Sequence, residues 1–525
     1  MQKTCLTCSQ QFEILPQERE FYEQKVHLPP PVDCPQCRVI RRMSWRNDRT
    51  FYKRKCDKSG KDIISMYAPN SPYKVYHQSE WWKQESGSWD PMDYGQEFDF
   101  TRPFFEQFHE LQLKVPRLGM DLVNCENSDY CNYCGDDKNC YLDIAGEGNE
   151  DCYFNLFTKF SKDTADCTFA YSSILCYESL HLYNCYNTRF SMYCETTNDS
   201  LFCYDMKGCR NCIFSFNLRQ KEYCIANKQY SKEEYEKYIQ SLQLHTSEGL
   251  ENAYSHWRKL LKEAPITYRD QEKTACEDST GNNLKNCKNT FNSFNVIKSE
   301  DCAYLYDVLD AKDCYDLNYS LYKPEFSCEL ISTLAMKNSA YCMASHYCDN
   351  VFYCDLVNNS SDLFGCIGLN RKKFCILNKQ YTEEEYREMI PRIIEYMSKT
   401  GEWGKFFPAK FSPHSYNETV AQEYFPLAED QARTNKNPSA EALSCKNCHR
   451  NFRIIPHESR FYKKMQIPSP ALCPLCRHLR RNTLRTPRKL FPDTCASCQK
   501  NIETTFPPDH TEKIHCEKCY MAFIQ

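Results

Sequence analysis

Twelve cysteines near the two ends of the chain are the residues whose type and spacing could do chemistry. They form Cys-x2-Cys pairs, which aim two thiolates at one point, and two such pairs make the tetrahedral four-sulfur site that zinc prefers. The predicted ligand sets are Cys5, Cys8, Cys34 and Cys37; Cys445, Cys448, Cys473 and Cys476; and Cys495, Cys498, Cys516 and Cys519. They predict about three Zn²⁺ ions. Ribbons this small lack a core, so we expect the metal to supply folding energy and to be structural.

The composition favours metal sites over disulfides. The chain has 525 residues and 36 cysteines, and its first residues lack the apolar core of a signal peptide. We therefore expect a cytoplasmic protein whose thiols stay reduced. The mean hydropathy is −0.72, and no apolar run reaches the roughly 18 residues of a membrane helix, so we expect no membrane partner.

The two ends of the chain repeat each other at an offset of about 440 residues, from the first cysteine pair to Cys34-Pro35-x-Cys37-Arg38 and Cys473-Pro474-x-Cys476-Arg477. The C-terminal end adds a second ribbon, whose N-terminal copy has lost its cysteines. The positions opposite Cys495, Cys498, Cys516 and Cys519 are Cys56, Ser59, His77 and Glu80. Cys56, His77 and Glu80 could hold a metal with one open position, as catalytic zinc sites do. The favoured alternative is a lost site held by packing of Trp81, Trp82 and Trp89.

An arginine run follows each first ribbon. Spacings of three and four residues predict a helix with most of these side chains on one face, ended in the C-terminal copy by Pro487. The net charge is −4, so nucleic-acid binding would depend on such local patches. One interpretation is a nucleic-acid interface; the other is a solvated face, or arginines paired with acids elsewhere in the chain. The candidate nucleic-acid-binding residues are Arg38, Arg41, Arg42, Arg46, Arg49, Arg477, Arg480, Arg481, Arg485 and Arg488.

Between the ends lie two cysteine-rich arrays that repeat each other at an offset near 150 residues. In the first array every gap between successive cysteines is a multiple of three, and short segments such as Asn139-Cys140-Tyr141-Leu142 predict strands of about four residues. Regular short strands with turn residues between them favour a β-solenoid with cysteines stacked inside and asparagines in left-handed turn positions. Each array should end in a short helix capped by Ser231 and Glu234 or by Thr382 and Glu385. The rival interpretation is further metal or redox chemistry at Cys131-x2-Cys134 and Cys209-x2-Cys212.

These elements together predict a mainly β, multidomain chain: two tandem β-solenoid-like (parallel β-helix) arrays flanked by N- and C-terminal zinc ribbons, with short helices. The predicted segments are a zinc ribbon with a basic helix (1–50), a degenerate second ribbon with a Trp-rich strap (51–100), the first array with its capping helix (101–242), a helical linker (243–275), the second array with its capping helix (276–399), an aromatic and proline-rich strap (400–440), a zinc ribbon with a basic helix (441–491) and a second zinc ribbon (492–525).

Several motifs carry a resemblance to a known group of proteins. They are the Cys-Pro-x-Cys-Arg-x-x-Arg-Arg runs from Cys34 and Cys473, Trp81-Trp82, the Asn-Lys-Gln-Tyr ends at Asn227 and Asn378, and the stretch 401–408. The chain resembles large cysteine-rich zinc-ribbon proteins of candidate-phylum bacteria with reduced genomes, over nearly its whole length. It departs from them at Ser59 and at His77 to Glu80, where cysteines are expected. The resemblance implies a cytoplasmic bacterial setting and no particular activity.

The function we expect is a non-enzymatic, zinc-binding scaffold whose ribbons present arginines to nucleic acid or a nucleoprotein complex. RNA is slightly favoured over DNA, by analogy with the zinc ribbons of translation and transcription. Glycine-rich phosphate loops and convergent groups of histidines and carboxylates are both missing from the sequence. The alternatives are a β-helix enzyme, either an acyltransferase or a polysaccharide-acting protein, and a thiol-based metal store or redox protein.

Overall fold

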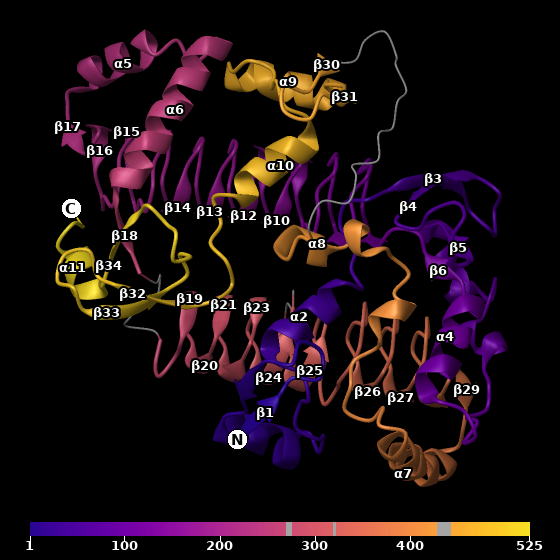
Figure 1. The fold of residues 1–525 in the computed structure, drawn as a ribbon. Helices are drawn as coiled ribbons and strands as arrows, with labels where there is room; N and C mark the ends of the chain where they lie inside the picture. Colours follow the sequence, from indigo (N-terminus) through magenta and orange to yellow (C-terminus); the bar gives the residue numbers. More distant parts are fainter. Residues whose placement is uncertain (269–275, 319–321, 428–442, 525) are drawn as a thin grey trace. The chain divides into compact units, whose positions relative to one another are not determined.

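The structure is a computed structural model that describes residues 1–268, 276–318, 322–427 and 443–524. It divides into two compact units. Unit 1 joins Met1–Met120 to Arg269–Ala428 and Arg488–Leu490, and unit 2 joins Asp121–Tyr268 to Glu429–Pro487 and Phe491–Gln525. The N-terminal ribbon therefore shares a unit with the second array, and the C-terminal ribbons share a unit with the first array. Both units are rich in small sheets with short helices between them (Figure 1).

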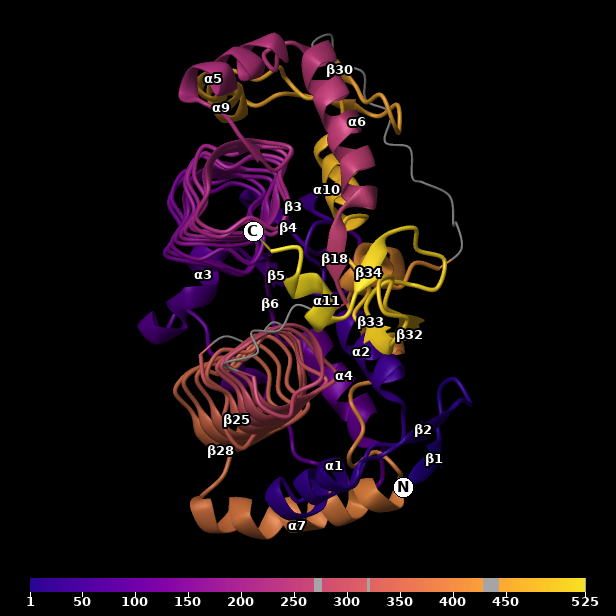
Figure 2. The ribbon, with the colours of Figure 1, turned by 90° about the vertical axis from the view of Figure 1, so that its left-hand side faces the viewer.

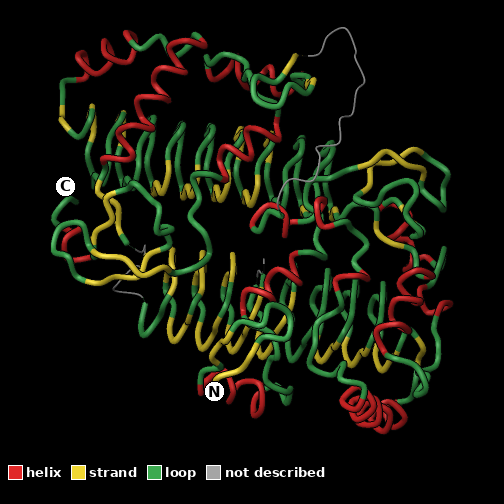
Figure 3. Tube along the Cα trace, in the orientation of Figure 1, coloured by secondary structure: helices red, strands yellow, loops and turns green. Residues whose placement is uncertain are grey.

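The first array consists of turns of chain that pair in parallel with a register of twelve residues. Leu180 pairs with Thr168, and Met192 pairs with Leu180. The sheets contain two to four strands, and loops occupy much of each turn (Figure 3). The strands are β7 (Leu122–Val123), β8 (Cys134–Gly135), β9 (Glu150–Tyr153), β10 (Leu156–Lys159), β11 (Lys162–Ala165), β12 (Thr168–Tyr171), β13 (Leu180–Tyr183), β14 (Met192–Glu195), β15 (Arg210–Ile213), β16 (Glu222–Ile225) and β17 (Lys228–Gln229).

The second array repeats this arrangement in unit 1, and its parallel pairing also advances by twelve residues, as from Asp349 to Ser361 and on to Lys373. Seen end-on, the chain of each array runs in closed turns (Figure 2). The strands are β19 (Gly281–Lys285), β20 (Lys288–Phe291), β21 (Ser293–Ile297), β22 (Glu300–Ala303), β23 (Tyr306–Leu309), β24 (Lys312–Leu317), β25 (Glu325–Leu330), β26 (Asp349–Phe352), β27 (Ser361–Phe364), β28 (Lys373–Ile376) and β29 (Lys379–Gln380).

Hydrogen bonding explains which residues occupy the inside of the arrays. Every third residue points inward, and where the inward side chain twelve residues earlier can accept, the backbone N–H donates to it: Ser161 N to Asn149 Oδ1, and Ser173 N to Ser161 Oγ. Small side chains that both accept and donate satisfy this geometry. The Cys185 thiol donates to the carbonyls of Tyr183 and Cys194, 3.3 Å away in each case. Buried cysteine thus serves as a small, weak donor as well as a space filler.

The residue before each inward position takes a left-handed conformation. Asparagine fills many of these positions, as predicted, for example Asn139 and Asn184. Aromatic residues fill others, including Phe157 and Phe169, whose rings stack 5.1 Å apart. Stacking on the outside of the turns offsets the steric strain that left-handed backbone imposes on a bulky side chain.

Capped helices follow both arrays, as the sequence predicts. The boxes form at Ser231 with Glu234, ahead of α5 (Lys232–Ser241), and at Thr382 with Glu385, ahead of α7 (Glu383–Lys399). The predicted helical linker contains α6 (Ser247–Glu263) and then a strand, β18 (Pro265–Thr267). Its last residues, 269–275, and the tether 428–442 lie outside the described residues. Sequence reasoning missed α4 (Phe104–Lys114), which precedes β6 (Arg117–Leu118) and the first turn of the array; the strap contains α8 (Val420–Tyr424).

The ribbons are hairpins followed by short helices. The first type is β1 (Gln2–Thr4), β2 (Gln11–Glu13), α1 (Pro16–Glu20) and α2 (Pro35–Met43), and its copy is β30 (Leu443–Ser444), β31 (Asn451–Phe452), α9 (Pro456–Met465) and α10 (Pro474–Asn482). The second type is β32 (Phe491–Thr494), β33 (Asn501–Thr504), β34 (Lys513–His515) and α11 (Glu517–Met521), and its degenerate copy is β3 (Tyr52–Lys55), β4 (Asp62–Ser65), β5 (Val75–Tyr76) and α3 (Gln78–Trp81).

The basic helices are shorter than predicted. Helix α2 ends at Met43, and Asn47 closes a turn just beyond it by bonding Thr50 N and Thr50 O. Helix α10 ends at Asn482, before Pro487. The later arginines of each run therefore lie outside the helices. Within the described part of the chain, no helix is long and apolar enough to cross a membrane.

Candidate metal centres and buried arginine clusters

Three groups of four cysteines have the geometry of metal centres. The groups are Cys5, Cys8, Cys34 and Cys37; Cys445, Cys448, Cys473 and Cys476; and Cys495, Cys498, Cys516 and Cys519. In each group the four sulfur atoms lie within 4.8 Å of one another. The Sγ atoms are 3.8 Å apart for Cys8 and Cys34, and 3.7 Å apart for Cys498 and Cys516. A tetrahedron with metal–sulfur bonds of about 2.3 Å has edges of about 3.8 Å, so these groups fit a metal ion such as zinc.

In each group, backbone N–H donors lower the pKa of one thiol. Burial alone would raise the pKa of the Cys495 thiol, but backbone N–H groups, foremost that of Cys498, lower it to about 5. The same balance lowers the pKa of Cys445 to about 6 and that of Cys5 to about 7. The N–H of Cys516 donates to Cys495 Sγ over 3.3 Å. Metal ligands must be deprotonated, so these bonds favour metal binding.

The degenerate ribbon has the fold of an intact one, but its three candidate ligands make other contacts. Cys56 Sγ accepts a bond from His77 N over 3.4 Å, as Cys495 accepts from Cys516 N. The His77 ring caps α3 by accepting from Ser79 N, and Glu80 forms an ion pair with Lys83. Among the described residues, Cys56, His77 and Glu80 do not come together as a ligand group.

The arginines of α10 are buried against the first array. Arg477 and Arg481 form ion pairs of 2.9 and 2.7 Å with Asp166, and all three side chains are at most 1% exposed. Arg477 also pairs with Glu458 of the same ribbon, and Arg480 pairs with Glu178 of the array. The cluster therefore fixes the ribbon to the outer face of the array.

An equivalent cluster fixes the N-terminal ribbon to the second array. Arg38 and Arg42 form ion pairs of 2.9 and 3.1 Å with Asp316, and Arg42 pairs with Glu329 over 2.6 Å. Arg38 also pairs with Glu18 of its own ribbon over 3.2 Å. Each partner sits at the same repeat position as its counterpart in unit 2. Burial raises the pKa of Glu18, and the charge of Arg38 opposes that shift.

This burial corrects the prediction that the arginine runs present a face to nucleic acid. A fully enclosed guanidinium has no donor to offer a phosphate, and the pairing with acids elsewhere in the chain, the alternative weighed above, is what the structure contains. Arg46 is also buried and pairs with Asp48. Arg41 and Arg488 pair with Asp33 and Asp307. Arg485 lies over the Phe169 ring of the first array, 5.0 Å from its centroid, and both Arg485 and Arg49 are partly exposed.

The acidic partners were missed because sequence reasoning treated the arrays as apolar cores. A signal did exist: Asp166 and Asp316 occupy matching positions of the two arrays, as do Glu178 and Glu329, and all four adopt left-handed backbone. These acids repeat at the array offset near 150 residues, and the arginines repeat at the ribbon offset of about 440, so the two sets could have been matched.

The paired cysteines of the first array point inward. The thiols of Cys131 and Cys134 donate to the backbone carbonyls of Asp129 and Asn132. The thiols of Cys209 and Cys212 likewise donate to Lys207 O and Arg210 O. Neither pair belongs to a group of metal-ligating atoms among the described residues.

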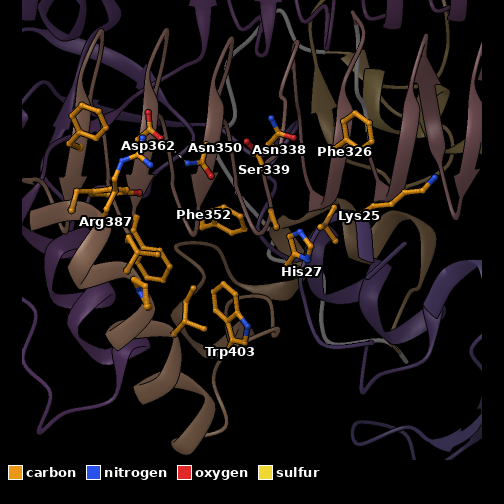
Figure 4. A pocket seen from close by; sticks show the side chains of 18 residues that line it. Lys25, His27, Phe326, Asn338, Ser339, Asn350, Phe352, Asp362, Arg387 and Trp403 are labelled. Carbon is orange, nitrogen blue, oxygen red and sulfur yellow. Dashed lines mark hydrogen bonds between the residues drawn. The ribbon is translucent and has the colours of Figure 1, made fainter. Parts of the chain in front are cut away.

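A cavity of about 720 Å³ in unit 1 lies between the second array and α7 (Figure 4). Its wall is aromatic, with Phe326, Phe352 and Trp403 in view. Several polar groups that line it make hydrogen bonds of their own: Asn350 Nδ2 donates to Asp362, and Ser339 Oγ donates to Lys337 O. The cavity therefore shows no activated nucleophile next to a base.

Comparisons with known proteins add little. No family model and no curated protein matches the chain, so the resemblance to zinc-ribbon proteins of candidate-phylum bacteria stays a prediction. One crystal structure, of a Desulfovibrio desulfuricans protein described as an acetyltransferase, aligns with 50% of this chain and 69% of its own at 8% identity. Its TM-score of 0.11 is too low to support an argument about fold or activity.

Proposed function

We propose that this protein is a non-enzymatic, zinc-bound scaffold in which each terminal ribbon locks onto a β-solenoid array. The buried arginine–carboxylate clusters carry the proposal, because they occur twice, at equivalent positions, and join a ribbon to an array each time. A ribbon freed of its metal would lose the helix that holds these arginines.

Zinc is the metal we assign to the three four-cysteine groups. Four thiolates at tetrahedral spacing suit zinc or an iron of the rubredoxin type, and hydrogen bonds to the sulfur atoms suit both. Zinc is favoured because these ribbons serve as supports for α2 and α10, which calls for no redox change. Metal analysis of the purified protein checks the assignment, and iron in place of zinc would overturn it.

A β-solenoid interpretation of the arrays is supported by the parallel register of twelve residues and by the inward position of every third side chain. In such an array each turn supplies the hydrogen-bond partners of the next, and a capping helix shields the open end. Helix α7 runs along the side of the second array, where it faces Asn338, Asn350 and Asp362 of successive turns.

Hydrogen exchange with and without a zinc chelator tests the scaffold. Removing zinc should release α2 and α10, so that protection falls in the ribbons and also around Asp166 and Asp316, while the inward residues of the arrays stay protected. Unchanged exchange around both aspartates would show that the metal does not hold the ribbons in place. Residues 443–482 and 1–50 give the peptides to follow.

The expected partner is nucleic acid, with RNA slightly favoured, or a nucleoprotein complex. This stays a prediction, and the buried arginines no longer support it. The exposed cations Arg450, Arg460 and Lys463 of the C-terminal ribbon support it in place of the buried arginines. Binding of this kind would come from phosphate contacts and would weaken steeply with salt.

A further inference from the structure

One turn of the first array carries two carboxylates and a thiol on its inward positions. Asp137, Cys140 and Asp143 are each at most 1% exposed, and one ligand atom from each lies within 4.8 Å of the others. Most inward positions of this array hold neutral side chains, so two acids separated by only one inward position need a reason.

Gly146 follows at the next inward position and supplies no side chain. A Cβ atom built there would lie 2.6 Å from Oδ2 of Asp137 and 2.6 Å from Oδ2 of Asp143. Both carboxylate oxygens are therefore aimed at the space that a side chain at Gly146 would fill.

The hydrogen bonds leave one of these oxygens without a partner. Asp137 Oδ1 accepts from Asn149 N over 2.9 Å, but Asp137 Oδ2 is buried with no donor. Asp143 accepts from Asn149 Nδ2 over 2.9 Å and from Thr158 Oγ1 over 2.7 Å, which fixes its orientation. Burial raises the pKa of Asp137 to about 6, although hydrogen bonds from Asn149 and the charge of Lys159 oppose the shift.

We propose that Asp137, Cys140 and Asp143 bind a divalent cation of the zinc type inside the first array, with the space at Gly146 left for a water ligand. A thiolate with two carboxylates is a zinc set, whereas calcium and magnesium take oxygen ligands only. Binding displaces the proton of the Cys140 thiol to solvent, and the unpartnered Asp137 oxygen gains its missing contact.

Metal analysis of the intact chain tests the site, through Gly146→Ala. The added methyl group would occupy the space between the two carboxylates. Gly135→Ala is the matched control, because a Cβ at Gly135 meets nothing within 4 Å. The expected zinc-to-protein ratio is four in the wild type and in the control, and three in Gly146→Ala.

A ratio of three in all proteins overturns the internal site and leaves the three ribbon sites intact, so the two ideas fail separately. Asp137→Asn covers the possibility that Gly146→Ala disturbs folding. With a metal site, this variant loses one zinc and melts at a lower temperature. If the two carboxylates merely share a proton, it keeps its zinc content and melts at the same or a higher temperature.

Discussion

Arg42 and Asp316 are 274 residues apart in the chain and form an ion pair of 3.1 Å with both side chains fully buried. The pair connects the N-terminal ribbon to the second array. The ion pair of Arg481 with Asp166 does the same for the C-terminal ribbon and the first array. The two contacts are equivalent because ribbons and arrays are both duplicated.

Replacing Arg42 with alanine should destabilise unit 1 by about 3 kcal/mol, because it removes one of the two arginines that pair with buried Asp316 and the nearest partner of buried Glu329. Denaturant unfolding followed by circular dichroism measures the change. Arg19→Ala is the control, since Arg19 forms an exposed pair with Glu23 and should leave the unfolding curve unchanged. Equal curves for the two variants would contradict a locking role for Arg42.

Restoring the lost cysteines should create a new zinc site. The hairpins β3–β4 and β32–β33 have the same four-pair register, and Cys56 already accepts the N–H bond that Cys495 accepts. The triple variant Ser59→Cys, His77→Cys and Glu80→Cys should therefore bind one more zinc than the wild type. Metal analysis reads this directly. The single variant Ser59→Cys should gain none, and a triple variant that also gains none would show that the ribbon has lost its geometry.

Acid should destabilise unit 1 through His414. Burial, reinforced by the charge of Arg117, lowers the pKa of His414 to about 3. The unfolded chain takes up a proton near its ordinary pKa of about 6.5, so the stability that neutral His414 provides is complete above that pH and is lost as the pH falls towards 3. The loss at pH 5 is about 2 kcal/mol.

His414→Gln should remove this part of the pH dependence. Unfolding free energies of both proteins at pH 7 and pH 5 give the comparison, in which any loss of zinc at pH 5 cancels. The same difference between the two pH values in both proteins would rule His414 out as the cause.

Cysteine at inward positions should tolerate serine better than alanine. Cys354 Sγ accepts the N–H of Cys366 over 3.4 Å and donates to Phe352 O. Cys354→Ser keeps both bonds, whereas Cys354→Ala leaves a buried N–H unsatisfied, at about 1–3 kcal/mol. Thermal unfolding separates the variants. A serine variant as unstable as the alanine one would mean that the sulfur matters for its size, and a loss of metal in either would favour a metal store.

Nucleic-acid binding, if present, should depend on exposed cations and not on the arginines of α10. Reversing Arg450, Arg460 and Lys463 to glutamate should weaken RNA binding and flatten its salt dependence, by about one unit of slope per lost contact, while the fold persists. Fluorescence anisotropy over a salt series measures both effects. Reversal of Arg480 and Arg481 would undock the ribbon and so cannot serve as the test. RNA binding that the surface variant leaves unchanged would exclude this ribbon as the interface.

Local patterns predicted much of this molecule. Cysteine pairs, capping boxes at Ser231 and Thr382, and gaps of three residues between array cysteines all reflect bonds made within a few residues or one turn. The arginines of α2 and α10 show where local patterns fail. Whether a guanidinium meets water or a buried aspartate depends on residues hundreds of positions away, and the acids that receive it lie on strands and turns whose role as docking surfaces appears only in three dimensions.

The internal aspartates show a second limit. Asp137 and Asp143 resemble ordinary turn residues in the sequence, and only the triplet register places them inside. Once that register is known, Gly146 at the next inward position becomes informative. Neighbouring inward residues fill the interior with side chains, and glycine leaves a space there.

The crossed assignment of ribbons to arrays has a consequence for synthesis on the ribosome. Arg38 and Arg42 emerge first, but their partner Asp316 follows 274 residues after Arg42. At about 5–20 residues per second, the nascent N-terminal ribbon carries its arginines without their carboxylates for roughly 14–55 s. In the same way, Asp166 of the first array lacks its partners until Arg477 and Arg481 are synthesised. Neither unit can be completed in the order of translation, because the first array is finished only after Arg477 and Arg481 have left the ribosome.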